Sequence, residues 1–240
     1  MLGIGDFGAR QRDSEVGFRQ LPGRTLRGGR DRVDDAALGG SHHGLVPNGS
    51  TATATARVFS GTGFLWRVTV KAICANTPVG LQYVSLTSTT PVSPGSPVVG
   101  AKPICPSTKR LIGFGGTVSG GRIMSFMPQN RPATGVWLSG RPFPGTSGTL
   151  TVRAMAVCAN AGFVSSFDEP PLATSQGQPV TSTASCPAGM YVHAAAGWAA
   201  TDPAYISEVA VDSTKTTASL TLRSSASSSF SGKVVPFCVG

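Results

Sequence analysis

The stretch Val152-Arg-Ala-Met-Ala-Val-Cys-Ala-Asn160 decides the fold class, because its residues alternate and because it is repeated. Val152, Ala154, Ala156 and Cys158 fall on one face of an extended chain, since successive side chains of a β-strand point to opposite sides. The pattern recurs at Val68-Thr-Val-Lys-Ala-Ile-Cys-Ala-Asn76 and, more weakly, at Lys233-Val-Val-Pro-Phe-Cys-Val-Gly240. The three cysteines are 84 and 80 residues apart, which indicates an internal repeat of about that length.

A second signature opens the repeats. Cys105-Pro106 precedes the strand-like Leu111-Ile-Gly-Phe-Gly-Gly116, and Cys186-Pro187 follows 81 residues later. The spans from these cysteines to Cys158 and Cys238 are 53 and 52 residues. We therefore predict a truncated first β unit with its linker at residues 36–100, a second at 101–181 and a third at 182–240.

The composition agrees with an all-β protein. Only 13% of the 240 residues are charged, and 31 Gly and 18 Pro interrupt segments rich in Val, Thr and Ser. No apolar run approaches the roughly 18 residues of a membrane helix, and helical spacing is not sustained anywhere. We expect tandem small antiparallel β-sandwich repeats, preceded by an irregular arm at residues 1–35 that has seven Arg, six acids and no alternation.

The five cysteines favour disulfides over a zinc site, because the chain has no CxxC and only three His. Pairing within units joins Cys105 to Cys158 and Cys186 to Cys238, leaves Cys74 free and lets each unit stand alone. Two alternatives remain: Cys74–Cys105 with Cys158–Cys186, or reduced buried thiols. Disulfides imply an oxidising compartment, whereas the first ten residues have no apolar signal-peptide core. We expect either a different start or another route out of the cell, such as lysis with a phage particle.

The Cys-Pro opening, the Gly115-Gly116 strand end and the closing Ala156-Val-Cys-Ala159 resemble a family of secreted actinobacterial repeat proteins of largely unassigned role. Cys186-Pro-Ala-Gly189 and Ala72-Ile-Cys-Ala75 match the same motifs, and the resemblance covers residues 36–240. Similar modules occur in surface and phage-tail contexts. The resemblance implies a fold and an extracytoplasmic location, but its motifs are structural and imply no ligand.

Catalytic residues are scarce. Ser41 adjoins His42 and His43 without forming a GxSxG elbow, and no acid occurs between residues 36 and 167. His193 falls in an apolar strand and is interpreted as structural. We expect no catalytic, metal or cofactor site; a hydrolase that uses Ser41 or His193 is the third choice of function.

Two sets of residues are candidates for binding. Trp66, Trp137 and Trp198, one in each unit, either stack on sugar rings or each fill the core of one sandwich. Residues 36–167 carry a net charge of +10, within a chain total of +9. Such a field attracts anionic polymers. The basic residues assigned to this role are Arg67, Lys71, Lys109, Arg110 and Arg153, of which Arg67, Lys71 and Arg153 are expected to form an outward stripe.

The sequence thus predicts a non-enzymatic protein that works outside the cytoplasm: in the extracellular medium, at the cell surface or in a virion. Its first predicted role is a surface, adhesion or phage-tail structural module that associates with itself or with other surface or virion proteins. The alternative is a lectin-like module that binds an anionic cell-wall polysaccharide. Nucleic acid is disfavoured because recognised nucleic-acid-binding motifs are absent.

Overall fold

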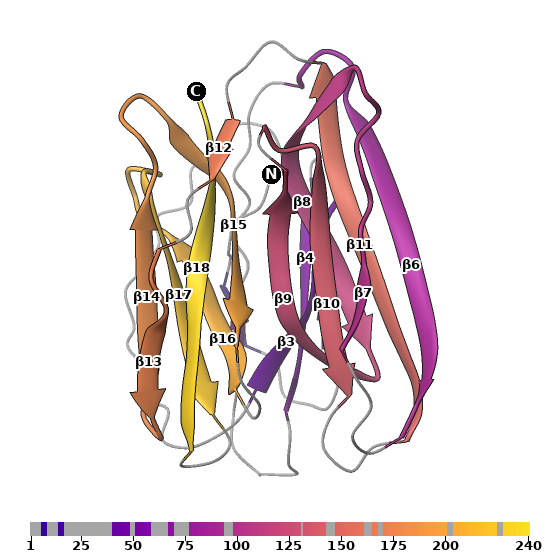
Figure 1. The fold of residues 1–240 in the computed structure, drawn as a ribbon, viewed down its shortest axis with the longest axis vertical. Helices are drawn as coiled ribbons and strands as arrows, with labels where there is room; N and C mark the ends of the chain where they lie inside the picture. Colours follow the sequence, from indigo (N-terminus) through magenta and orange to yellow (C-terminus); the bar gives the residue numbers. More distant parts are fainter. Residues whose placement is uncertain are drawn as a thin grey trace.

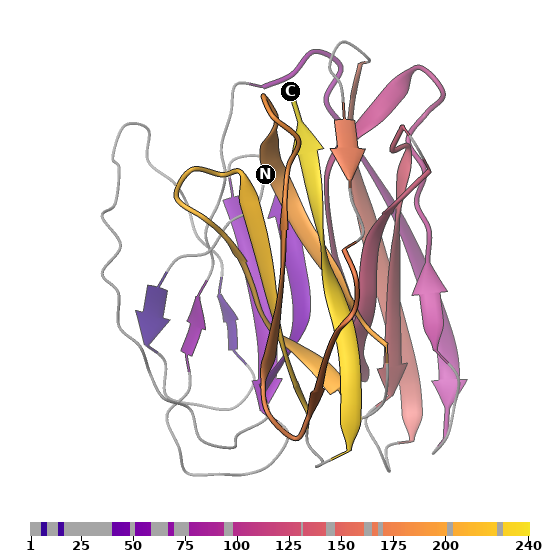
Figure 2. The same ribbon diagram turned by 60° about the vertical axis from the view of Figure 1, so that its left-hand side comes forward.

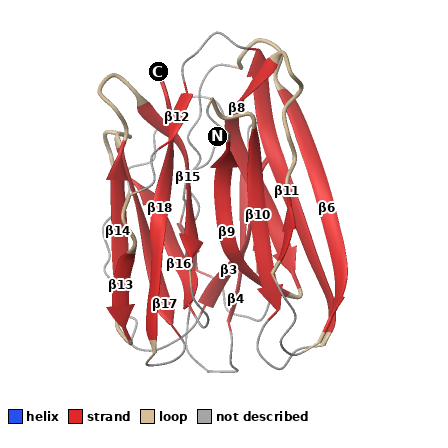
Figure 3. Cartoon of the chain, viewed as in Figure 1, coloured by secondary structure: helices blue, strands red, loops and turns tan. Residues whose placement is uncertain are grey.

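The protein is represented by a computed structural model. It describes residues 6–8, 14–16, 40–48, 51–58, 67–69, 77–93, 98–130, 132–142, 147–160, 165–167, 170–200, 204–224 and 228–240. All of the regular elements in these residues are β-strands (Figure 3). The all-β class predicted from the sequence is confirmed.

Two sandwiches have the same strand order. The middle sandwich contains β6 (Gln82–Val92), β7 (Val99–Ala101), β8 (Lys109–Ser119), β9 (Gly121–Gln129), β10 (Gly135–Pro142) and β11 (Gly148–Asn160). The C-terminal sandwich contains β13 (Ala173–Gln176), β14 (Val180–Ser185), β15 (Tyr191–Ala199), β16 (Ala204–Val211), β17 (Thr217–Ser224) and β18 (Ser229–Val239). Each sandwich has two layers. Layer β6-β11-β8 of the middle sandwich corresponds to β13-β18-β15 of the C-terminal one, and layer β7-β10-β9 corresponds to β14-β17-β16. Each sandwich therefore begins before its Cys-Pro, so the strands are not divided at the expected boundaries 100/101 and 181/182.

The remaining strands lie mainly toward the N-terminus. They are β1 (Asp6–Gly8), β2 (Ser14–Val16), β3 (Gly40–Asn48), β4 (Thr51–Val58), β5 (Arg67–Thr69) and, between the sandwiches, β12 (Ser165–Phe167). β1 pairs with β5, as β6 pairs with β11 in the middle sandwich. β2 pairs with β4, as β7 pairs with β10 (Figure 2, indigo and purple arrows). The irregular arm expected at residues 1–35 thus includes two short paired strands, and the rest of the arm lies outside the described residues.

The sheets run from one repeat into the next. β9 of the middle sandwich pairs with β15 of the C-terminal one, which gives the order β12-β18-β15-β9-β10-β7, and β13 also pairs with β18 (Figure 1). In the same way β3 pairs with β8 and gives the order β2-β4-β3-β8-β11-β6. The repeats are therefore joined edge to edge and are not a row of separate sandwiches.

Bulges recur at corresponding positions. A register shift in β8 leaves Ile112 unpaired against β11, and the shift in β15 leaves His193 unpaired against β18. Strands β3, β9 and β16 carry a second bulge, at His43, Met124 and Ser207. A bulge increases the local twist and bends a strand, so the middle and C-terminal sandwiches bend at the same two places, and β3 shares the second of them.

One hydrophobic core spans both sandwiches. Phe114 of β8 packs edge-on against Phe126 of β9, with ring centroids 4.9 Å apart, and against Phe237 of β18 at 6.0 Å. A Cβ added at Gly116 would overlap Leu138, and one at Gly197 would overlap Leu220. These two glycines, one in β8 and one in β15, therefore allow the opposite layer to approach closely.

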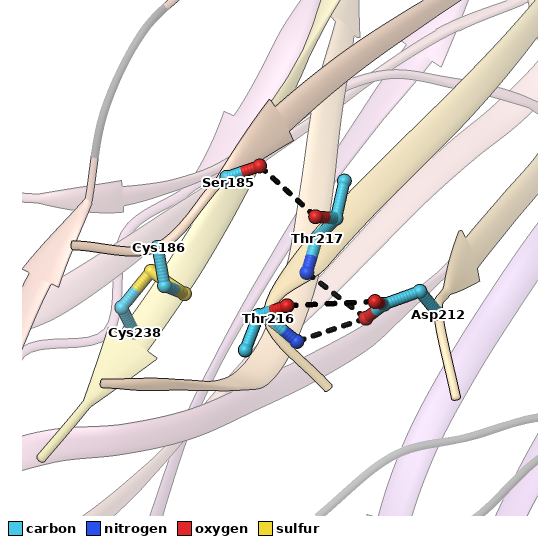
Figure 4. The surroundings of a disulfide bond; sticks show 6 residues. All are labelled: Ser185, Cys186, Asp212, Thr216, Thr217 and Cys238. Atoms are coloured by element: carbon cyan, nitrogen blue, oxygen red, sulfur yellow. Dashed lines mark hydrogen bonds between the residues drawn. A yellow bond between two sulfur atoms is a disulfide. The ribbon is translucent and has the colours of Figure 1, made fainter. Parts of the chain in front are cut away.

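The disulfides are Cys105–Cys158 and Cys186–Cys238, which is the pairing within units that the sequence favoured. Cys74 lies outside the described residues. The backbone N–H of Cys105 donates to Thr134 O, and that of Cys186 donates to Thr216 O, both at 2.7 Å. Each Cys-Pro loop is thus held by a disulfide to the closing strand and by a hydrogen bond to the neighbouring hairpin. Figure 4 shows the Cys186–Cys238 bond.

Candidate functional site

A cleft of about 360 Å³ lies where the middle and C-terminal sandwiches join. It opens on the outer face of the sheet β12-β18-β15-β9-β10-β7, along a row of residues that pair from one strand to the next. The row runs from β18 to β7 through Lys233, Trp198, Ser125, Ser139 and Gly100. The pairing of β9 with β15 therefore builds the site, and neither sandwich contains it alone.

Small residues make the floor of the cleft. Ser139 is 2% exposed and Ser125 is 8% exposed, and each carries a hydroxyl that both donates and accepts hydrogen bonds. The next pair of residues along β9 and β10 is Met127 with Trp137, and their longer side chains line one side of the cleft. The hollow results from placing short side chains between long ones on the same face.

Trp137 and Trp198 both line this cleft. The indole of Trp137 lies over Gly100, where an added Cβ would overlap the ring carbons. Lys233 Nζ lies 5.6 Å from the centroid of the Trp198 ring, which is within the range of a cation–π contact. Of the two interpretations open in the sequence, a core tryptophan in each sandwich is wrong for these two, because both are half-buried on the outer face. Trp66 lies outside the described residues.

The corresponding surface between β3 and β8 serves as an internal comparison. There Thr117 stands opposite Gly44 and Arg153, as Trp198 stands opposite Ser125 and Lys233. Thr53 of β4 corresponds in the same way to Trp137. The basic position is kept and the aromatic positions are not, so the repeat folds without tryptophan at either place.

The cleft is electropositive. Arg141 and Lys233 line it, and none of its described lining residues is acidic. Arg122, only 1% exposed, pairs across the strands with Arg141. Burial, followed by the charge of Arg141, lowers the pKa of Arg122 below its usual value. Arg122 does not line the cleft, so Arg141 and Lys233 are the two described lining cations that suit an anionic group.

Of the basic residues predicted to bind an anionic polymer, Lys109, Arg110 and Arg153 have described side chains, and none of the three lines the cleft. Arg67 is in β5, which pairs with β1, whereas Arg153 is exposed on β11 of another sheet, so β5 and β11 do not present them on a shared sheet face. Lys109 Nζ donates to Gly80 O, and Arg110 Nη1 donates to Lys109 O at 3.2 Å. Lys71 lies outside the described residues.

Of the candidates for catalysis, His193 has a described side chain, and it does not line the cleft. Ser41, His42 and His43 lie in β3, and their side chains are outside the described residues. Burial lowers the pKa of His193, a hydrogen bond with the backbone of Ile112 opposes this effect, and Nδ1 has no partner among the described residues. No cluster of three His, Cys, Asp or Glu side chains that could hold a metal occurs in the described part of the chain.

Sequence reasoning missed most of the residues that line the cleft, including Arg141, Lys233, Ser125, Ser139 and Met127. Lys233 was detectable, because it stands five residues before Cys238, as Arg153 stands before Cys158. The serines and Met127 carry no signal of their own. They become part of a site only through the pairing of β9 with β10 and β15.

Comparison of the chain with protein-family models, curated proteins and solved structures found no match. Within the described residues, no helix is long and apolar enough to cross a membrane.

Proposed function

We propose that the protein is a non-enzymatic, lectin-like module that works outside the cytoplasm and binds an anionic saccharide in the cleft between β9 and β15. One observation carries the proposal: Trp137 and Trp198 line the same hollow as Arg141 and Lys233. Its volume of about 360 Å³ falls at the small end of the roughly 300–1,000 Å³ typical of ligand pockets. The two disulfides support an oxidising compartment.

Each part of the cleft has a role in this proposal. An indole offers a flat apolar face for the C–H face of a sugar ring, and its N–H remains a hydrogen-bond donor. The hydroxyls of Ser125 and Ser139 bind sugar hydroxyls on the floor. Arg141 and Lys233 bind a carboxylate, sulfate or phosphate, with Arg able to make two parallel hydrogen bonds.

Calorimetric titration with acidic and neutral oligosaccharides of equal length tests the proposal. Trp198→Ala should weaken binding of the acidic ligand about tenfold or more, which corresponds to roughly 1.4 kcal/mol. Lys233→Met should remove the preference for the acidic ligand. The matched controls, Thr117→Ala and Arg153→Met, change the corresponding positions of the other sheet and should have no effect. Failure of the native protein to bind either ligand would refute the proposal.

A surface, adhesion or virion-structural role is the second candidate. It requires contact between copies rather than a ligand cleft. The observation that favours it is a long open sheet edge at β6, on a different sheet from the tryptophans.

A further inference from the structure

Strand β6 is an open edge. It ends the sheet order β2-β4-β3-β8-β11-β6 and pairs only with β11 among the described strands. Figure 1 shows it at the right-hand margin of the molecule. At 11 residues it is the longest edge strand in the described part of the chain. In an antiparallel pair, every second residue turns its backbone polar groups away from the partner strand, so β6 presents a row of such groups on a side where no described strand pairs with it.

The corresponding edge of the C-terminal sandwich is protected. There β18 is covered by two short strands, β12 and β13, of three and four residues. Asp168, Glu169, Pro170 and Pro171 separate them. Short edges, charges and prolines are the usual means of preventing edge-to-edge pairing. The C-terminal sandwich therefore folds with a short, interrupted edge. The fold of the repeat alone does not account for the continuous length of β6.

The composition of β6 also suits pairing. Gln82–Val92 contains no charged residue, and its single proline, Pro91, stands next to the end. Large apolar side chains are exposed at or beside the strand: Val79 at 79%, Leu86 at 46% and Tyr83 at 39%. An uncharged edge with exposed apolar residues is the kind of surface that another strand covers.

We propose that β6 pairs antiparallel with β6 of a second copy of this chain and joins their six-stranded sheets across a two-fold axis. Thr87 is the middle residue of Gln82–Val92, so pairing over the full length of the strand places Thr87 opposite Thr87 and Leu86 opposite Ser88. Leu86 of each copy then extends the apolar layer that β11 forms with Ala154, its partner across the strands. A C2 interface uses the same patch twice, which an antiparallel strand pair satisfies.

The positive charge of the chain does not prevent this contact. The nearest exposed cation on the sheet is Arg153, which pairs with Thr87 from β11. With strands about 4.8 Å apart, the two Arg153 positions stand roughly 14 Å from each other across the joined edges. That separation exceeds the Debye length of about 8 Å at physiological salt, so their repulsion is largely screened.

Sedimentation velocity of the whole protein across a range of concentrations tests the pairing. The native chain should shift from monomer to dimer as its concentration rises. Thr87→Lys places two ammonium groups face to face and should shift the dimer dissociation constant upward at least tenfold. Thr174→Lys, on the short edge strand β13, is the matched control and should dimerise like the native chain. A native chain that stays monomeric at every concentration, or an undiminished Thr87→Lys dimer, would overturn the proposal.

Hydrogen exchange of the native chain tests the same contact without a variant. The backbone N–H groups of β6, which Pro91 lacks, should exchange more slowly at high than at low protein concentration, while those of β13 should not change. Concentration-dependent protection elsewhere, with none in β6, would also overturn the inference. Neither experiment involves the cleft, so this proposal and saccharide binding succeed or fail separately.

Discussion

Gly100 shows how one residue without a side chain positions a functional one. The indole of Trp137 packs against Gly100 because no Cβ projects from β7 at this point. Gly100→Ala should therefore push the indole out of place and weaken saccharide binding about fivefold, with little loss of stability, since β7 is a short edge strand. Fluorescence titration of a double-mutant cycle checks this. Gly100→Ala should have no further effect in a Trp137→Ala background, and additive losses would contradict the mechanism.

Asp212 is a residue whose role is structural, and its effect depends on pH. Its carboxylate accepts hydrogen bonds from the backbone N–H groups of Thr216 at 2.8 Å and Thr217 at 2.9 Å (Figure 4). Its hydrogen bonds, first that of the Thr214 hydroxyl and then that of the Thr217 backbone, lower the pKa of Asp212 below its usual value. A carboxyl whose pKa is lower in the folded state stabilises the fold above its unfolded pKa. The contribution is lost as the pH falls through the folded pKa.

Melting temperatures measured from pH 7 to pH 2 test this account. Asp212→Asn should lower the melting temperature at pH 7 and should flatten its decline below about pH 4. Glu208→Gln, on the same hairpin, serves as the control, because Glu208 accepts only a long 3.4 Å hydrogen bond from Thr221. An unchanged acid limb in Asp212→Asn would mean that other carboxyl groups control acid unfolding.

At the scale of elements, the disulfides connect strands that are distant in sequence. The Cys186–Cys238 bond closes a span of 52 residues between the loop before β15 and the end of β18. Cys186→Ser with Cys238→Ser should lower the free energy of unfolding by about 3–4 kcal/mol, because the open chain gains entropy in the unfolded state. Urea unfolding measures this difference. Cys105→Ser with Cys158→Ser should cost a similar amount, and a much smaller loss in both would show that the thiols need not pair.

The elements were largely predictable and the cleft was not. Alternation around Cys158 and the repeated Cys-Pro identify strands, repeats and pairing within units, because those signals are local or periodic. The cleft depends on which edge strands of neighbouring repeats meet. Ser125 and Trp198 are 73 residues apart, and only the β9–β15 register makes them neighbours. The short strands β1 and β2 were also missed, because three residues are too few to show alternation.

The whole molecule should unfold as one unit. Phe237 of the C-terminal sandwich packs on Phe114 of the middle one, and β15 completes its sheet through β9. Residues 170–240 alone would expose this interface, so we expect that fragment to lack the near-ultraviolet circular dichroism of packed aromatic residues. The whole chain should melt in a single calorimetric transition. Two separate transitions, or a folded fragment, would show independent sandwiches.

The central claim is that the junction of the two sandwiches binds an acidic saccharide. The most direct measurement is the ¹H–¹⁵N spectrum of the three indole N–H groups during titration with an acidic oligosaccharide, with signals assigned by Trp137→Phe and Trp198→Phe. The account predicts that the signals of Trp137 and Trp198 shift together with one dissociation constant, and that a neutral oligosaccharide of the same length shifts them far less. Binding of the acidic ligand that leaves both signals in place would contradict it.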